Sequence, residues 1–368
     1  MKNILFIHSS SELYGSDRSL LNIIKNIDKT KYKPYVILPC EGPLVDEMKK
    51  IPETSVEIFE IAVLRRKNLS IRGGLEYFKH YRKSIKYVKN FIKKYAIDIV
   101  DTNTAVVFPG AIAAKRMKVK NVWHIREIIK SNLENKVISF IMNRYADVIV
   151  ANSKATGKAL NVNQDKVRVV YNAVEQILEQ TIAHHDGIVV GMAGRINRWK
   201  GQKLFVDAAK IVHAKYPSVV FQIAGDTYVG EDYIKQELKE YISENKLEDT
   251  VKLLGQVNNM PKFYSGLDVF VLPSIQPEPF GLVVIEAMEY CIPVIATNHG
   301  GPTEIISDGI DGYLVDYNNA NEMAERICEL VKDSDKCREM GRKAQEKKRD
   351  LFSVRTMVNS IEKIFEQV

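Results

Sequence analysis

The chain has 368 residues, which is more than one hydrophobic core usually supports, so its length predicts two domains of similar size. Hydrophobic residues make up 45% of the sequence and charged residues 27%, a balance that excludes a largely disordered chain. The net charge of +7 alone says little about partners, but eleven basic residues and a single acidic one fall within 64–95.

Targeting and redox signals are few. The longest stretch without Asp, Glu, Lys or Arg, 290–303, is broken by Pro293, so no transmembrane helix is expected. The first residues read as a strand rather than a signal peptide, because acidic residues follow. The four cysteines contain no C-x-x-C pair, which predicts neither a zinc site nor a disulfide framework and fits a reducing cytoplasm.

Apolar, β-branched runs alternate with helical patterns along the chain. In the first half, strands are expected at 3–8, 35–38, 56–59, 97–100, 121–124 and 147–150. After a polar break at 179–186, strands are expected at 188–191, 219–223, 251–254, 269–272, 294–296 and 313–315. The pattern predicts an α/β protein with two doubly wound domains, 1–175 and 186–351. The apolar stripe of the tail, 352–368, is expected to pack back on the first domain.

The loop after the first strand, 9–17, lacks the G-x-G-x-x-G of dinucleotide binding. Gly15 and Ser16 would let backbone N–H groups approach a phosphate at the start of a helix expected near Arg18, with Asp17 as its cap. A plain strand-to-helix turn explains the same residues, and the spacing leaves both readings open.

The basic segment predicts a helix over 74–95 with two faces. Apolar residues that repeat every three or four positions are expected to be core: Leu75, Phe78, Tyr81, Ile85, Val88, Ile92 and Tyr95. The opposite side carries a basic ridge of Lys79, Arg82, Lys83, Lys86, Lys89 and Lys93, flanked by Arg65, Arg66, Lys67 and Arg72. This ridge is either a solvated face or a surface that rests on an anionic membrane.

A second loop with charged residues follows the expected strand at 188–191. Gly194, Arg195 and Lys200 would stand at the carboxyl edge of the sheet, where α/β proteins bind ligands. A planar guanidinium and a mobile ammonium suit a diphosphate, although a solvated basic turn is the simpler alternative. Arg198 and Trp199 are expected to serve packing or the surface.

The stretch 272–288 carries two carboxylates. Prolines on both sides stiffen a loop that presents Glu278, and Gly281 opens a helix that carries Glu286. If the whole span were helical, the carboxylates would lie roughly 12 Å apart, whereas a glycosidase pair needs about 5 to 9.5 Å. The spacing favours a grip on opposite ends of a long ligand, with backbone N–H groups of 281–283 facing an anion. Alternatively, Glu286 only caps or salt-bridges its helix.

The run from Glu278 to Glu286 resembles the E-x7-E motif of the family 4 retaining glycosyltransferases, which have the GT-B fold of two Rossmann-like domains facing a central cleft. The resemblance extends over the C-terminal half through 194–195, 200–201, 268–274, 293–297 and 300–304. In the first half it is looser, through the Gly15 loop, 124–127, 151–153 and 171–173. The chain departs from the family where Ser16 and Cys291 replace glycines.

The resemblance implies roles for individual residues. Catalytic roles fall to Glu278, His124, Arg195 and Lys200. Donor binding falls to Gly15, Gly194, Arg195, Lys200, Glu278, Phe280, Gly281, Leu282, Val283 and Glu286, and acceptor contacts to Ser16, Asp17, Arg126 and Glu127. Taken by itself, His124 reads equally well as a satisfied core histidine. Alanine in place of Glu278 or Lys200 is expected to leave the fold intact, because both side chains should face a solvent-filled cleft.

The implied reaction is retaining transfer of a sugar from a UDP- or GDP-sugar to a hydroxyl of a glycan or lipid-linked glycan, in cell-surface polysaccharide synthesis at the inner face of the plasma membrane. No cofactor, metal or nucleic acid is expected, and the D-x-D match at Asp333 and Asp335 reads as surface. A nucleotide-sugar epimerase on a similar fold is the alternative. A nicotinamide-dependent oxidoreductase and a non-catalytic membrane-surface module fit the motifs less well.

Overall fold

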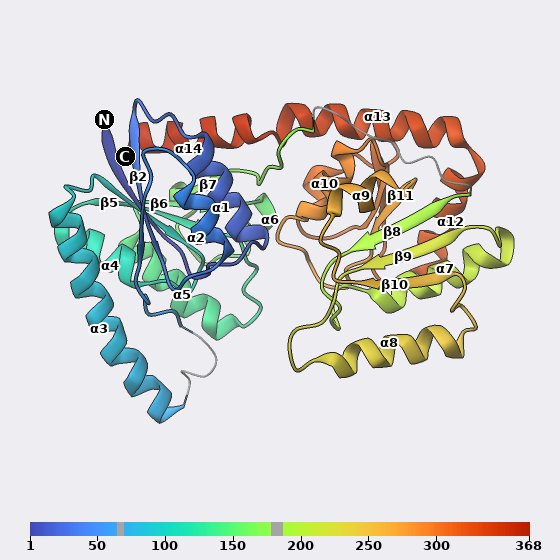
Figure 1. Ribbon diagram of the computed structural model, residues 1–368, viewed down its shortest axis with the longest axis horizontal. Helices are drawn as coiled ribbons and strands as arrows, with labels where there is room; N and C mark the ends of the chain where they lie inside the picture. The colour runs from blue at the N-terminus through green and yellow to red at the C-terminus, as the bar shows by residue number, and fades with distance from the viewer. Residues whose placement is uncertain (65–69, 178–186) are drawn as a thin grey trace. The chain divides into compact units, whose positions relative to one another are not determined.

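The computed structural model describes residues 1–64, 70–177 and 187–368 (Figure 1). Contacts within the chain divide it into two compact units. Unit 1 comprises Met1–Ala173 and Val354–Val368, and unit 2 comprises Val174–Ser353. The predicted flanking cations Arg65, Arg66 and Lys67 lie outside the described residues, as does the side chain of Arg72.

Unit 1 is built on a seven-stranded sheet whose neighbouring strands all run parallel. Its order is β3-β2-β1-β4-β5-β6-β7, so the direction of winding reverses between β1 and β4. The strands are β1 (Lys2–Ile7), β2 (Tyr32–Leu38), β3 (Ser55–Ile58), β4 (Ile99–Asn103), β5 (Lys120–Ile125), β6 (Val148–Ala151) and β7 (Val167–Val169).

Helices cover both faces of this sheet, because successive strand residues point to opposite sides. Leu5 and Ile7 face a core shared with α3 (Ile71–Lys94), α4 (Pro109–Met117) and α5 (Asn132–Tyr145). Ile4 and Phe6 face a core shared with α1 (Gly15–Asn26), α2 (Pro43–Lys49) and α14 (Val354–Gln367). The short α6 (Lys154–Lys158) and a 3-10 turn (Gln164–Lys166) precede β7.

The C-terminal helix α14 belongs to unit 1 through its apolar stripe. Phe365 is fully buried, and its ring meets the ring of Phe6 edge-on at a centroid distance of 6.2 Å. The Lys2 ammonium donates to the Phe365 carbonyl at 2.6 Å. The chain therefore begins and ends within the same unit (Figure 1).

Unit 2 repeats the doubly wound plan with a six-stranded parallel sheet of order β10-β9-β8-β11-β12-β13. The strands are β8 (Val189–Ala193), β9 (Val220–Ala224), β10 (Val251–Gly255), β11 (Val269–Leu272), β12 (Val294–Thr297) and β13 (Gly312–Val315). The helices are α7 (Gln202–Lys215), α8 (Asp232–Glu244), α9 (Met260–Ser265), α10 (Leu282–Glu289), α11 (Pro302–Ile305), α12 (Ala320–Lys332) and α13 (Ser334–Leu351). The predicted α/β class with two doubly wound domains is confirmed.

Three details differ from the sequence-based expectations. Strand β7 was not predicted, and α1 begins at Gly15 rather than near Arg18. Leu75 and Phe78, expected in the core, are 70% and 56% exposed, because the first turns of α3 project beyond the sheet on which the helix packs (Figure 1). None of the described helices combines the length and the apolar character needed to span a membrane.

Candidate functional site

The sheet of unit 2 changes its winding direction between β8 and β11, and the loops that follow these two strands meet there. Gly201 has a φ of +77°, and a Cβ at this position would lie 1.8 Å from the carbonyl oxygen of Pro273. A Cβ on Gly225 would lie 2.0 Å from the carbonyl oxygen of Gly194. Only glycine fits such close approaches of backbone. Gly201 therefore brings the loops after β8 and β11 together at the carboxyl edge of the sheet, and Gly225 brings the loop after β9 against the loop after β8.

The central feature of this edge is an ion pair between Lys200 and Glu278. The Lys200 Nζ contacts Glu278 Oε1, to which the Ser274 hydroxyl also donates at 2.7 Å. The two side chains are only 16% and 6% exposed. The expectation that both face a solvent-filled cleft was therefore wrong, because the loops bury the pair. Each charge compensates the other, so removing one leaves a largely buried charge without its partner.

The helix α10 begins beside Glu278, at Leu282. Its N-cap is Gly281, whose φ of +99° favours glycine, and the first backbone N–H groups of the helix belong to residues 282 and 283. The loop before it is held by the Gly301 N–H, which donates to the Glu278 carbonyl at 2.8 Å. The arrangement gives an anion-binding helix terminus next to a carboxylate and an ammonium.

Phe280 was predicted to contact the donor, but its side chain is buried. Phe280 is 2% exposed, and its ring meets that of Phe352 at a centroid distance of 5.8 Å. The ring therefore anchors the loop in the core of unit 2 and is not available to a ligand.

The cations of the first loop differ in their surroundings. The Arg195 guanidinium stacks on Tyr228, with Cζ 3.4 Å from the ring centroid. The ring of Trp199 lies 4.6 Å from the Lys200 ammonium, so Trp199 packs against the ion pair. Arg198 is exposed and pairs with Glu237 at 2.9 Å, as expected of a surface residue.

Glu286 lies one turn further along α10 and is half-buried. The Tyr264 hydroxyl donates to Glu286 Oε2 at 2.7 Å, and the Tyr264 ring stacks on Tyr290. Burial, together with the charges of Glu286 and Glu289, raises the pKa of Tyr290 to about 12. The Tyr264 hydroxyl therefore orients the Glu286 carboxylate, which can still accept further hydrogen bonds.

In unit 1, polar side chains gather at the ends of β4 and β5. His124 Nε2 lies 2.9 Å from Asp101 Oδ2, and both side chains are buried. Asp101 also accepts from the Asn103 amide at 2.7 Å. With Nε2 engaged, Nδ1 is the ring atom of His124 that can face a ligand. Thr104, just beyond β4, has a φ of 74°, which is strained for a β-branched residue and typical of functional edges.

Two predicted acceptor contacts of this unit, Arg126 and Glu127, are held in a buried environment. Arg126 donates to the Ser19 hydroxyl and to Asn172 at 2.6 and 2.5 Å, and burial lowers the pKa of its guanidinium to about 10. Its buried Nε has no partner among the described residues. Burial also raises the pKa of Glu127.

The structure corrects the position of Asp17, which is the third residue of α1 rather than its cap. It accepts from the Tyr14 N–H at 2.9 Å and contacts His8 Nε2 at 2.6 Å. Because Asp17 is buried with these internal partners, it is a poor direct acceptor contact. Gly15 and Ser16 form the first turn of the helix, so their backbone N–H groups stand at its N-terminus.

Sequence reasoning missed several members of these clusters. His8 directly follows the buried strand β1 and Asp101 lies within the buried strand β4, so a polar residue in or just after an apolar run was a usable signal. Tyr228 and Tyr264 come from other loops and helices, and nothing in their local sequence marks them.

Two doubly wound parallel sheets, with charged side chains at the carboxyl edge of each, are the architecture of a GT-B glycosyltransferase. The family model described as Glycosyl transferases group 1 matches residues 174–347, and the model described as Glycosyltransferase Family 4 matches residues 14–176. The chain belongs to the family 4 glycosyltransferases.

Individual relatives agree with this placement. The chain is 26% identical over 295 residues to an uncharacterized glycosyltransferase of Methanocaldococcus jannaschii, covering 77% of this chain and 79% of the relative. It is 25% identical over 361 residues to the UDP-Gal:alpha-D-GlcNAc-diphosphoundecaprenol alpha-1,3-galactosyltransferase of Escherichia coli, covering 85% and 87%. The Anabaena protein HepE, solved in complex with UDP and glucose, matches with a TM-score of 0.84 and 26% identity over 100% of both chains.

Proposed function

We propose that this glycosyltransferase moves a sugar from a UDP- or GDP-sugar to a hydroxyl with retention of the anomeric configuration. The observation that carries the proposal is the buried Lys200–Glu278 pair beside the N-terminus of α10. The protein must bind the donor through its anionic diphosphate and its hydroxyl-rich sugar. This edge offers a cation and helix N–H groups for the diphosphate and a carboxylate for the sugar hydroxyls. The UDP in the related Anabaena structure favours UDP among the two nucleotides.

The chemistry asks the protein to stabilise negative charge on the departing diphosphate. Lys200, Arg195 and the first N–H groups of α10 would meet this charge electrostatically. Since Glu278 Oε1 is engaged by Lys200 and Ser274, Oε2 would accept from the sugar hydroxyls. Glu286, oriented by Tyr264, would accept from the ribose hydroxyls. Because these groups meet the phosphate charge, the proposed reaction needs no divalent metal.

Retention requires either two displacements through an enzyme nucleophile or front-face attack by the acceptor hydroxyl. Glu278 is fixed by two hydrogen-bonding partners, which suits a stationary acceptor better than a nucleophile that must form and break a bond. We therefore propose that the acceptor hydroxyl attacks on the face that the diphosphate leaves, through an oxocarbenium-like transition state. The role of His124 in contacting the reacting sugar stays a prediction, as do acceptor contacts by Ser16 and Glu127.

The acceptor is proposed to be a glycan, free or lipid-linked, in cell-surface polysaccharide synthesis. The name of the Escherichia coli relative specifies a diphosphoundecaprenol-linked acceptor. An enzyme with such an acceptor works at a membrane surface, and the basic ridge of α3, whose members are exposed or half-buried, would rest on anionic lipid at the cytoplasmic face.

A panel of nucleotide sugars tests the proposed function. Thermal unfolding is followed with each UDP- and GDP-sugar in the presence of EDTA, because a ligand that binds the native state raises the unfolding midpoint. At least one donor should stabilise the protein without metal. Stabilisation by no donor, or only after magnesium is restored, would contradict the proposal. Conversion of the donor alone into a different nucleotide sugar would instead indicate an epimerase.

A further inference from the structure

Between α3 and α4 lies an open hollow whose lining includes five cations. Four come from successive turns of α3 and one from the last turn of α4: Arg82, Lys83, Lys86, Lys89 and Arg116. Sequence periodicity had placed the first four on a ridge. The contribution of α4 becomes visible only in the fold, where α3 packs against α4 in one layer.

These cations have no acidic partner among residues 1–64, 70–177 and 187–368. None of the acidic residues in these ranges lines the hollow, and none of the five cations forms an ion pair there. Two of the cations lie near an aromatic ring: the Arg82 guanidinium lies 6.0 Å from the ring of Phe78, and the Lys83 ammonium lies 5.8 Å from that of Phe59. Like charges held together without counter-charges repel one another, so an anion that enters the hollow relieves this repulsion.

Apolar side chains adjoin the cations. Phe78 and Tyr81 line the hollow itself, and Leu75 lies one turn before Phe78 with 70% of its surface exposed. The α5 helix of the same layer also carries an exposed apolar stripe of Leu133, Val137 and Phe140, which does not line the hollow. A surface that pairs cations with exposed apolar side chains fits an amphiphile, whereas a free phosphate or a nucleic acid would leave the apolar part without a partner.

We propose that the hollow between α3 and α4 binds the phosphate headgroup of an anionic phospholipid, while Leu75 and Phe78 enter the adjoining hydrocarbon. This deepens the membrane attachment proposed above and rests on it, since it assigns the attachment to one lipid-binding site rather than to the whole basic ridge. It does not depend on the nature of the donor or on the transfer reaction.

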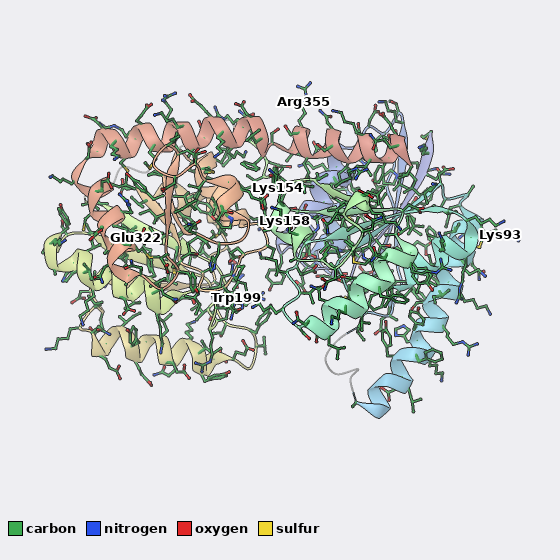
Figure 2. The ribbon with its side chains drawn as sticks, turned by 180° about the vertical axis from the view of Figure 1, so that it is seen from behind. Lys93, Lys154, Lys158, Trp199, Glu322 and Arg355 are labelled. Carbon is green, nitrogen blue, oxygen red and sulfur yellow. The ribbon has the colours of Figure 1, made fainter. Side chains whose placement is uncertain are left out.

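The test uses cosedimentation of the full chain with phosphatidylcholine vesicles, with and without phosphatidylglycerol. Arg116→Gln and Lys115→Gln form a matched pair on α4, because the two residues are adjacent and exposed but only Arg116 lines the hollow. On α3, Arg82→Gln/Lys86→Gln is matched by Lys79→Gln/Lys93→Gln, which removes the same charge outside the hollow. Lys93 points outward from α3 (Figure 2).

We expect binding only to vesicles with phosphatidylglycerol, weakened about fivefold by Arg116→Gln and about 30-fold by the Arg82/Lys86 variant. The matched variants should bind more tightly than their partners, and inorganic phosphate should compete poorly. Equal losses of vesicle binding in both members of each pair would overturn the headgroup site and indicate that the whole basic ridge contributes without a specific site. No vesicle binding, or tighter binding to an RNA oligonucleotide, would overturn the lipid assignment. Donor-induced thermal stabilisation, measured on the same variants, should be unchanged and reports on the enzyme separately.

Discussion

At the scale of single residues, the buried Lys200–Glu278 pair is the feature on which the proposed donor site depends. Its members lie 78 positions apart in sequence, and the close approach of Gly201 to Pro273 brings their loops together. Burying two charges costs desolvation energy that a well-packed apolar pair would avoid, so such a pair is weak evidence for a stabilising role. A ligand-binding role accounts for its position better.

Substitutions at this pair separate binding from stability. Lys200→Met and Glu278→Gln should each reduce transfer roughly 100- to 1,000-fold, because one preorganised charge contact is lost. Lys200→Met should also lower the unfolding midpoint, since Glu278 is left without its cation. The double variant Lys200→Met/Glu278→Gln should recover stability but not transfer.

Lys210→Met on α7 is the matched control, because Lys210 is exposed and its ammonium donates to the Asn245 side chain. It should transfer sugar normally. Near wild-type transfer by the double variant would show that the pair has a structural role alone.

Cys291 occupies a position that favours glycine. It follows the C-cap of α10 with a φ of 57°, and the family resemblance had marked it as a replaced glycine. Cys291→Gly should stabilise unit 2 by about 1 kcal/mol, since the left-handed conformation costs a residue with a Cβ about that much. Cys291→Ala keeps the Cβ and should give no gain. Thermal unfolding of the wild type and the two variants measures this difference. A glycine variant no more stable than the wild type would contradict the prediction.

The sequence predicted the charged residues of the donor site but not the side chains that contact them. The charges of Glu278, Glu286, Arg195 and Lys200 follow from short motifs at strand ends. Their partners could not be predicted, because Tyr228 and Tyr264 arrive from elements that no local pattern connects to the site. The burial of Phe280 likewise depends on Phe352, which is distant in sequence.

At the scale of elements, parallel strands were predictable because both faces are buried and their sequences are continuously apolar. β7 was not predicted because it has only three residues, none of them buried, at the edge of its sheet. The burial of Leu75 and Phe78 in the first turns of α3 was wrongly predicted for a different reason. Its apolar periodicity continues to Leu75, but the sheet that would bury this turn does not extend to it.

The helices α12 and α13 are joined by a charged cluster that depends on pH. Glu329 of α12 contacts Lys336 of α13 and pairs with Arg326 at 3.0 Å. The hydrogen bond from Lys336 is the main cause that lowers the pKa of Glu329 to about 2. A carboxylate with a lowered folded-state pKa contributes stability above its unfolded pKa, near 4.5, and loses it as the pH falls towards 2.

Glu329→Gln should therefore lower the unfolding midpoint of unit 2 at neutral pH, and the difference from the wild type should shrink as the pH falls below about 4.5. Glu325→Gln, on the exposed side of the same helix, should have little effect at any pH. Calorimetric scans across this range measure both. A destabilisation by Glu329→Gln that is the same at pH 3 and pH 7 would exclude the electrostatic origin.

At the scale of the whole molecule, the two units share one plan, in which a parallel sheet changes its winding direction beside a cluster of charged side chains. His124 and Asp101 lie at this edge in unit 1, and Lys200 and Glu278 lie at it in unit 2. The alternation of strands and helices was sufficient to predict both sheets except for the edge strand β7. The hollow between α3 and α4 was not predictable, because Arg116 joins the α3 cations only after α4 packs beside them.

The most direct test of the central claim is the anomeric configuration of the product. The enzyme would be incubated in EDTA with the nucleotide sugar that stabilises it and with a GlcNAc-diphospholipid acceptor of the kind specified for the Escherichia coli relative. NMR of the purified product should show the new linkage with the anomeric configuration that the sugar had in the donor. An inverted linkage would contradict retention and, with it, the proposed front-face reaction at the Lys200–Glu278 site.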